Sequence, residues 1–399
     1  MIFCLLITLF GIITLFFCYI RLKYKFWRIQ PVFHFYDLYY WFVNVGIINL
    51  DLPEKNKYVN LKHIETMEFD NLSTNKLTEF VMFIQMNFLS NIDNKYLPTI
   101  NNIKPYFKNH NSKSFVSIYW EPILLLNNKT NIPINDKKMI GVITSRPMHI
   151  LINDKYNNIN KFNAYYVDYL CVDKHYRKKN IAPQLIQTHE YNQRRLNNNI
   201  YVSLFKREGE LTGIIPLTTF NTCCFKTESW YNEPLPFNPS IALLVGDTKN
   251  LYYLYDLILL NTIWDITILP EISNIIELVT TQNMYIYMVV INDEIQCGYI
   301  FKRTKTFLEK DKEVLSCICS IKGVVDDNIF IQGFKLALWN ILKSNKKFCY
   351  IALEDISNNN ILIQNLTIKT KPYIVSPTAY FFYNFAYEPF KSNKACILI

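Results

Sequence analysis

Residues 167–183 read VDYLCVDKHYRKKNIAP and join three kinds of segment without a break. An apolar run typical of a buried strand leads into a basic turn, and the turn leads into the start of a helix. Backbone N–H groups at such a strand end can polarise a thioester carbonyl, while the cationic turn and the helix N-terminus favour phosphates. The stretch therefore predicts a site for an anionic acyl carrier.

Four further segments accompany this stretch in a fixed order along the chain. They are YKFW with QPV at 24–27 and 30–32, GVITSRP at 141–147, ALE at 352–354 with Asn358, and YFFYN at 380–384. Together these segments resemble the N-myristoyltransferases, the family that moves a myristoyl group from coenzyme A to an N-terminal glycine. The resemblance covers nearly everything after residue 23.

The composition excludes several other classes of protein. Hydrophobic residues make up 50% of the chain and aromatic residues 16%, so an ordered core is expected. With only 9 glycines, neither common glycine-rich nucleotide motif occurs. No C-x-x-C pair occurs among the 10 cysteines, so no metal is expected. The net charge of +9 is spread among acidic residues, and no nucleic-acid partner is expected.

Residues 2–20 form an uncharged apolar run, close to the roughly 20 residues that cross a bilayer. Basic residues follow at once, beginning with Arg21 and Lys23, which favours a cytosolic position for the rest of the chain. We therefore expect residues 1–22 to be a single-pass membrane anchor, with the catalytic part facing the cytoplasm. A cleaved signal peptide and a buried helix are the alternatives. The family is usually soluble, so the anchor would be a departure.

Hydrophobic periodicity predicts helices over 77–87, 182–196 and 330–342, and a loop over 91–113. It predicts strands over 114–119, 139–145, 164–172, 200–205, 285–290, 297–302, 316–322, 349–353 and 380–385. This order resembles the GNAT acyltransferase fold, of which the N-myristoyltransferases are a fused pair. The resemblance implies an α+β protein with mixed sheets flanked by helices. Its two GNAT-like halves would be an acyl-CoA-binding half at 23–215 and a peptide-binding half at 216–399.

The resemblance assigns catalytic roles to three residues. The backbone amides of Tyr169 and Leu170, at a bulged strand end, would stabilise the oxyanion, and the terminal carboxylate of Ile399 would take the proton. An α-carboxyl group has a pKa of about 3.5 and an α-ammonium about 8, so burial in the apolar tail is needed to strengthen this base. The chemistry needs no metal or cofactor, and myristoyl-CoA is the co-substrate.

Contacts to the acyl carrier are expected at the strand end, the basic turn, the helix start and the N-terminal segment. The expected residues are Lys25, Phe26, Trp27, Tyr169, Leu170, Cys171, Val172, Arg177, Lys178, Lys179, Asn180, Ile181, Ala182 and Pro183. Pro183 suits the first turn of a helix, and Asn180 tolerates a positive φ where general acetyltransferases prefer glycine. The structural alternatives are a solvated basic turn and a core tryptophan.

Several positions depart from the family pattern. Asp168 stands where the family has asparagine beside the oxyanion amides, Lys226 replaces a histidine, and Val375 belongs to a segment that replaces glycine-aspartate-glycine. Cys396 begins a possible prenylation box, and its processing would remove Ile399. These departures leave peptide preference and retention of activity open.

The expected activity is direct attack of an N-terminal glycine amine on myristoyl-CoA, by a monomeric enzyme acting on glycine-starting proteins or peptides. One alternative is a transferase for another acyl chain or another amine. A second is a non-catalytic, membrane-anchored homologue that binds peptides. Acyl-chain profiling tests the first alternative, and peptide binding without coenzyme dependence would indicate the second.

Overall fold

A computed structural model describes residues 2–43, 45–89, 94–126, 133–153, 159–209, 213–230, 232–260, 263–309 and 311–399. The helices are α1 (Ile2–Lys23), α2 (Leu38–Phe42), α3 (Thr74–Asn87), α4 (Ile100–Ile103), α5 (Ile181–Leu196), α6 (Leu251–Leu260), α7 (Ile272–Thr280), α8 (Asp327–Ser344) and α9 (Asn359–Lys369). The first strands are β1 (Gly46–Ile47), β2 (Ile64–Glu68), β3 (Asn94–Tyr96), β4 (Phe115–Leu126), β5 (Pro133–Asn153), β6 (Ile159–Val172), β7 (Val202–Glu208) and β8 (Thr218–Lys226). The others are β9 (Ile241–Val245), β10 (Ile266–Leu269), β11 (Met284–Ile291), β12 (Glu294–Leu308), β13 (Lys312–Lys322), β14 (Phe348–Glu354), β15 (Ile374–Tyr383), β16 (Phe385–Ala386) and β17 (Ala395–Ile397).

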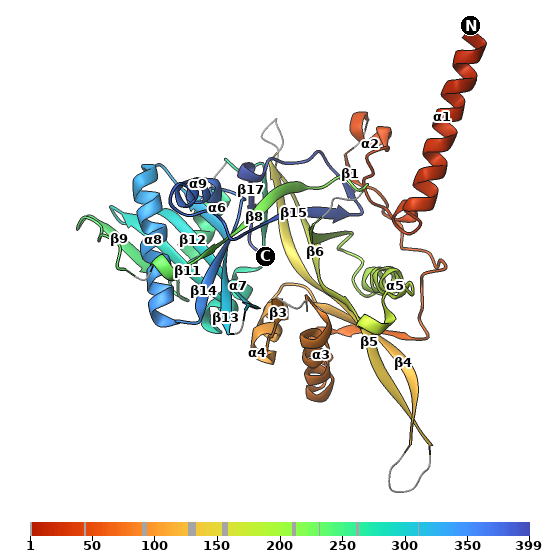
Figure 1. The fold of residues 1–399 in the computed structure, drawn as a ribbon, viewed down its shortest axis with the longest axis horizontal. Coiled ribbons are helices and arrows are strands. Elements are labelled where there is room, and N and C mark those ends of the chain that lie inside the picture. Colours follow the sequence, from red (N-terminus) through yellow and green to blue (C-terminus); the bar gives the residue numbers. More distant parts are fainter. Residues whose placement is uncertain are drawn as a thin grey trace.

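Helix α1 projects away from the body of the protein (Figure 1). The predicted membrane anchor at residues 1–22 is wrong, because no helix in the described ranges is both long and apolar enough to cross a bilayer. The expected membrane localisation is corrected with it.

Most of the described strands belong to one mixed sheet. The strand order is β17-β10-β5-β6-β7-β15-β8-β14-β13-β12-β11-β9, with β2, β3 and β4 attached beside this path. Strand β15, from the end of the chain, lies between β7 and β8 and continues the sheet from the earlier strands to the later ones. The expected α+β architecture, a mixed sheet flanked by helices, is confirmed.

The same strand-helix-strand unit occurs twice in this sheet. Strand β6 is followed by α5 and then by β7, which pairs with β6 in parallel. Strand β13 is followed by α8 and then by β14, which pairs with β13 in parallel. Parallel neighbours need a long crossover, and the two helices supply it. Antiparallel strands precede each unit, β4 and β5 in the first and β11 and β12 in the second.

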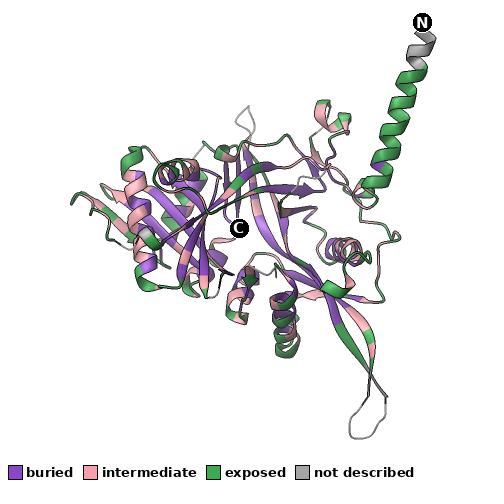
Figure 2. Cartoon of the chain, viewed as in Figure 1, coloured by how far each residue is buried: buried purple, intermediate pink, exposed green. Residues whose placement is uncertain are grey.

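The later part of the sheet is buried on both faces. Residues 313–321 of β13 are all buried, without the alternation of a half-exposed strand. Apolar side chains of α8 pack with Leu315 and Cys317 on one face, and those of α6 and α7 pack with Ile318 and Ile321 on the other. Helices on both sides of the sheet explain why the burial of this strand does not alternate. Figure 2 shows these strands as buried.

The C-terminal tail forms part of the sheet. Strand β17 pairs in parallel with β10, with Cys396 opposite Thr267, and the N–H of Leu398 donates to the carbonyl of Ile268 at 2.9 Å. Residues 395–399 are all buried. Figure 1 places the C-terminus in the middle of the molecule, while the N-terminus lies at the far end of α1. The last residue is therefore buried near the middle of the molecule.

The predicted helices at 77–87, 182–196 and 330–342 are confirmed within α3, α5 and α8, and the predicted strands fall within or overlap strands of the sheet. The loop predicted over 91–113 is wrong in part, since it contains β3, α4 and a 3-10 helix at Lys104–Phe107, while 91–93 lie outside the described residues. Thr99 and Asn102 form a reciprocal capping box at the start of α4. Pro105 occupies the first turn of the 3-10 helix, where its missing N–H costs nothing.

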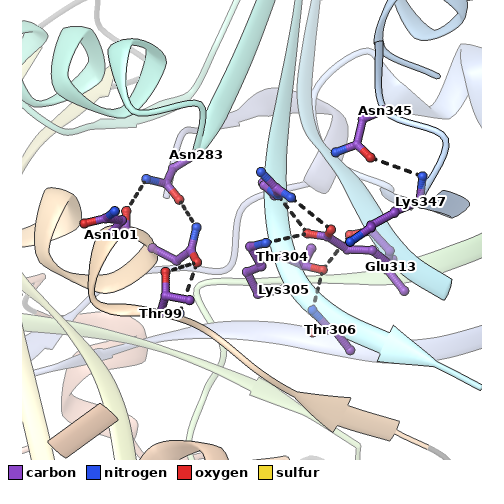
Figure 3. A network of polar contacts seen from close by, with 12 residues as sticks. Thr99, Asn101, Asn283, Thr304, Lys305, Thr306, Glu313, Asn345 and Lys347 are labelled. Atoms are coloured by element: carbon purple, nitrogen blue, oxygen red, sulfur yellow. Dashed lines mark hydrogen bonds and ion pairs between the residues drawn. The ribbon is translucent and has the colours of Figure 1, made fainter. Parts of the chain in front are cut away.

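Polar side chains connect α4 to the later strands (Figure 3). The amide nitrogen of Asn283 donates to the Asn101 carbonyl at 2.8 Å, and its oxygen accepts from Asn102 at 2.9 Å. The Asn283 carbonyl accepts the backbone N–H of Arg303 on β12 at 2.9 Å. These bonds hold β12 beside the segment that follows α3.

Candidate active site

A β-bulge interrupts β6 at the predicted oxyanion position. Opposite β5, Val142 pairs with Cys171 and Thr144 pairs with Asp168, so Tyr169 and Leu170 together oppose one residue of β5. The φ of Tyr169 is +48°, which is uncommon for a residue other than glycine. Such a bulge turns backbone groups out of the ladder and re-aims side chains. The predicted bulged strand end is thus present in the fold.

The bulge lies where two parallel strands separate. Strands β6 and β7 pair only from Ala164 to Val167 on β6, and the bulge begins two residues later. A cavity of about 360 Å³ is lined at this point by Tyr169 and Leu170 together with Ile186 of α5 and Phe205 of β7. Its volume falls within the range of small-molecule sites, roughly 300–1,000 Å³.

The predicted N-terminal contact segment contributes to the same cavity through one residue. Trp27 lines the cavity and stacks on Phe205, with ring centroids 5.8 Å apart and planes 14° apart. Phe26 packs edge-on against Trp27 and against Tyr58, and it does not line the cavity. Lys25 is exposed to solvent. Trp27 is the member of this segment that the structure brings to the bulge.

The side chains around the bulge point in different directions. Leu170 is 38% exposed and faces the cavity, whereas Tyr169 is buried and its hydroxyl lies 2.8 Å from that of Tyr96. Cys171 and Val172 are also buried, and burial raises the pKa of the Cys171 thiol to about 12. Cys171 is therefore a protonated core residue at neutral pH.

The cations of the basic turn differ in what they contact. The guanidinium of Arg177 donates to the Asn87 carbonyl at 2.9 Å and to the Val172 carbonyl at 3.3 Å, which fastens the end of α3 to the end of β6. Lys178 is exposed with φ +65°, and Lys179 is exposed with its ammonium 4.8 Å from the Tyr176 ring centroid. The lysines remain candidates for phosphate contact, whereas Arg177 is engaged by backbone carbonyls.

The first turn of α5 presents a helix N-terminus to this basic turn. Asn180 is the N-cap with φ +59°, and its side chain makes no cap hydrogen bond. Ile181 is buried, while Ala182 and Pro183 are half-buried. Helix N-termini leave N–H groups that favour anions, although Pro183 contributes none. Gly141 allows the close approach of α5 to β5, since an added Cβ would lie 2.8 Å from a methyl carbon of Leu185.

The predicted base lies in the interior. Ile399 is 5% exposed, and its carbonyl oxygen accepts a hydrogen bond from the Lys302 ammonium at 3.3 Å. Asp168, beside the bulge, is close enough to raise the pKa of Lys302 electrostatically. The structure thus brings the last residue and the bulge to the same charged region, with Lys302 between them.

This region gathers charged side chains from several strands. Arg146 on β5 is 1% exposed, its guanidinium lies over the rings of Tyr106 and Tyr166 at 5.1 and 5.2 Å, and no described residue accepts from its Nε or Nη2. Lys206 on β7 forms an ion pair with Glu354 on β14 at 2.9 Å. Glu354 is buried as well, whereas Asp168, Lys206 and Lys302 are half-buried. Burying charges is costly unless they serve a ligand or one another. We name Arg146, Asp168, Lys206, Lys302, Glu354 and the end of Ile399 the charged cluster.

Sequence reasoning missed most of the charged cluster. Arg146 and Glu354 belong to segments that were recognised, but neither received a role. The available signal was a charged residue within an otherwise apolar strand, as with Arg146 in GVITSRPM at 141–148. Lys302 gave no such signal, because Arg303 and Lys305 follow it closely in an ordinary basic run.

One expected catalytic donor already has a partner. The N–H of Tyr169 donates to the carboxylate of Asp168, its own neighbour, at 2.8 Å. An asparagine oxygen could accept the same bond without bringing a negative charge. This N–H is therefore already occupied in the structure.

The other positions singled out in the sequence lie in separate parts of the fold. Lys226, at the end of β8, lies with its ammonium 5.0 Å from the Tyr373 ring centroid, and Val375 on β15 is 53% exposed. Cys396 is buried in β17, with its sulfur 3.8 Å from that of Cys319. A modifying enzyme could reach Cys396 only if the tail left the sheet.

Comparison with known proteins identifies relatives of this fold. Residues 51–217 match the family model described as myristoyl-CoA:protein N-myristoyltransferase, N-terminal domain. A Saccharomyces cerevisiae N-myristoyltransferase structure with bound myristoyl-CoA matches with TM-score 0.69 at 15% identity, over 93% of this chain and 94% of that chain. A second such structure matches with TM-score 0.70 at 14% identity, over 93% and 89%.

A more distant fold likeness extends to another acyltransferase architecture. A tandem GNAT protein from the clavulanic acid biosynthesis pathway, without AcCoA, matches with TM-score 0.51 at 8% identity, over 82% of this chain and all of that chain. Comparison with curated protein sequences gives no match. At these identities, the structural matches establish a GNAT-like α+β fold, and the family model adds a sequence relationship.

Proposed function

We propose that this chain, whose residues 51–217 match the N-myristoyltransferase family model, transfers a myristoyl group from myristoyl-CoA to the N-terminal amine of a glycine-starting protein or peptide. The observation that carries this proposal is the bulge at Tyr169 and Leu170, which opens onto a cavity where β6 and β7 separate. The buried end of Ile399 approaches the same region through Lys302.

The acyl carrier would extend from the cavity to the basic turn. The aromatic and aliphatic walls formed by Trp27, Ile186 and Phe205 suit an apolar chain, and the bulge would hold the thioester. Phosphates would meet Lys178, Lys179 and the N-terminus of α5. Cys171, Val172 and Ile181 would support this path from the core rather than touch the carrier, because all of them are buried.

We propose that the two parts of the chain divide the substrates. All the residues that line the cavity lie between 27 and 214, except Tyr383. This distribution favours residues 23–215 as the acyl-CoA-binding half and leaves residues 216–399 to hold the peptide.

The reaction needs a neutral amine and a polarised carbonyl. The N–H groups of Tyr169 and Leu170 would stabilise the oxyanion that forms when the glycine nitrogen attacks the thioester carbon. The buried negative end of Ile399 would favour removal of the proton from the incoming ammonium. The coenzyme A thiolate then leaves, and no covalent enzyme intermediate is required.

Incubation of the whole chain with myristoyl-CoA and a glycine-starting peptide tests the proposal. Mass spectrometry should show a peptide heavier by one myristoyl group and an equal amount of free coenzyme A. The same peptide with an acetylated N-terminus is the control and should remain unchanged. Faster transfer from a shorter or longer acyl-CoA would indicate another acyl specificity. Peptide binding without acyl transfer at saturating substrates would overturn the enzymatic proposal.

A further inference from the structure

The cavity at the bulge continues between α5 and one face of the sheet. Val167 of β6 pairs with Phe205 of β7, and both line the cavity together with Ser203. Side chains two residues apart on a strand point to the same face, so Ser203 lies beside Phe205 but farther from the bulge. Ile186 and Glu190 of α5 line the cavity too, and their spacing of four residues places them on one face of the helix.

The walls of this channel change from apolar to polar with distance from the bulge. Val167, Ile186 and Phe205 supply aliphatic and aromatic surface near the bulge. Farther along, the cavity is lined by Ser203 and Glu190, which are 4% and 6% exposed, and the Ser203 hydroxyl bonds to the Glu190 carboxyl group. An acyl chain that starts at the bulge therefore meets a carboxyl group before it ends.

Two neighbouring rings that line the cavity are already held by the protein. Nδ1 and Nε2 of His189 lie 2.8 and 2.9 Å from the hydroxyl groups of Ser117 and Ser145. The Tyr383 hydroxyl donates to Oε1 of Gln30 at 2.7 Å. With both ring nitrogens bonded, His189 has no donor or acceptor left for a ligand.

Glu190 keeps capacity for a further hydrogen bond. A carboxylate offers about four acceptor positions. The structure gives this one the Ser203 hydroxyl, while Nη1 of Arg194 is 3.9 Å away, beyond hydrogen-bond distance. Burial raises the pKa of Glu190 to about 7, so near neutral pH the group is present both as an acceptor and as a protonated donor.

A saturated acyl chain would cover Glu190 without offering it a partner. Leaving a buried polar group without a hydrogen bond is costly, whereas supplying the bond restores what water provided. A hydroxyl group both donates and accepts. It can therefore bond to the Glu190 carboxyl group in either protonation state, with the Ser203 hydroxyl beside it.

The strand register places this polar part along the chain. Ser203 lies opposite Tyr165, four residues before Tyr169, which is about 13 Å at roughly 3.3 Å per residue. An extended acyl chain advances about 1.3 Å per carbon–carbon bond, so roughly ten bonds cover this distance. We propose that the preferred acyl group is a myristoyl chain with a hydroxyl group about ten bonds from the thioester carbon, recognised by Glu190 and Ser203. This inference rests on the proposed function and specifies its acyl donor; the hydroxyl group takes no part in the transfer.

Competition between acyl donors tests this inference without any substitution. The whole chain receives a glycine-starting peptide with equal amounts of myristoyl-CoA and its hydroxylated analogue, and mass spectrometry gives the ratio of the two products, which is the ratio of kcat/KM. The hydroxylated product should exceed the other about 3- to 10-fold, as expected for one net hydrogen bond. The isomer with its hydroxyl group about five bonds from the thioester, level with Phe205, is the matched control. It should transfer more slowly than myristoyl-CoA, because its hydroxyl group would be buried against apolar walls.

Two variants assign the preference to Glu190. Glu190→Leu removes the hydrogen-bonding group and should reverse the preference, so that myristoyl-CoA is the better donor. Glu190→Gln keeps a donor and an acceptor and should retain the preference for the hydroxylated chain. A preference unchanged in Glu190→Leu would overturn the role of this residue.

The outcomes separate this inference from the proposed function. Myristoyl transfer by the unaltered chain at least as fast as transfer of the hydroxylated chain would overturn the inference alone. Absence of transfer from every donor would overturn the proposed function, and the order in which the three acyl-CoAs bind, measured by calorimetry, would still test recognition of the hydroxyl group. Equal affinities would then overturn the inference as well.

Discussion

Asp168 is the residue at which the chain departs most directly from what oxyanion stabilisation requires. Its carboxylate accepts the Tyr169 N–H at 2.8 Å and raises the pKa of Lys302. Asp168→Asn keeps an acceptor for this N–H and removes the charge. We expect kcat at pH 7 to rise by about 3- to 10-fold, equivalent to roughly 0.7–1.4 kcal/mol in the barrier. Steady-state kinetics at saturating substrates measure this change, and a lower kcat would show that the carboxylate itself is needed.

Glu190 gives the stability of the protein a specific pH dependence. Burial raises the pKa of this carboxyl group from 4.5 to about 7, because its charged form loses water. The folded state therefore holds a proton that the unfolded state releases between pH 4.5 and 7. Stability falls over that window as pH rises, at a slope of at most about 1.4 kcal/mol per pH unit. Glu190→Gln should flatten this fall in urea unfolding, and an unchanged slope would contradict the assignment.

At the residue scale, the sequence allowed the position of backbone groups along a strand to be predicted. Tyr169 and Leu170 were predicted at a bulged strand end, and the strand register contains that bulge. The direction of a side chain could not be read in the same way. Arg177 was expected at the phosphates but fastens α3 to β6, because the end of α3 places the Asn87 carbonyl within its reach.

The basic turn and α5 form the element that should set affinity for the carrier. Lys178→Ala and Lys179→Ala each remove an exposed cation, and each should weaken myristoyl-CoA binding by about 2- to 5-fold, in line with 0.3–1 kcal/mol for such charges. The effect should shrink at high salt. Calorimetry at two ionic strengths measures it, with Lys137→Ala on the exposed part of β5 as the control. Equal loss in the control, or none in the turn variants, would remove the turn from the carrier site.

Long periodic elements were predictable because their pattern is repeated over several turns or pleats. Helices α3, α5 and α8 each bury one face, and β13 is buried along nearly its whole length. Short elements gave too few repeats, so β3 and α4 were read as loop. The apolar run before Arg21 fitted a membrane anchor on composition, but no helix among the described residues meets the length and hydropathy that a crossing requires.

At the scale of the whole molecule, the buried tail joins the two parts of the site. Adding two glycines after Ile399 would move the terminal charge away from Lys302 and force polar backbone into a buried position. We expect kcat to fall at least 100-fold, as for loss of a general base, with a smaller change in myristoyl-CoA affinity. Ile399→Leu keeps the chain length and the carboxylate and should retain most activity. An extended chain with a rate close to that of the unaltered chain would exclude a role for the terminus.

Long-range pairing was the part of the fold that the sequence could not supply. No local sequence pattern predicts that β15 lies between β7 and β8, or that β17 pairs with β10. The charged cluster depends on those pairings, since its members come from strands far apart in the chain. Its arrangement therefore became visible only in three dimensions.

The central claim is that a myristoyl thioester lies at the bulge of β6, and a crystal structure of the chain with a non-hydrolysable myristoyl-CoA analogue tests it most directly. We predict that the carbonyl oxygen lies about 2.7–3.1 Å from the backbone nitrogens of Tyr169 and Leu170. The acyl chain should occupy the cavity beside Trp27, and Asp168 should have turned away from the Tyr169 N–H. An analogue bound elsewhere, with the Asp168 carboxylate still on that N–H, would contradict the account.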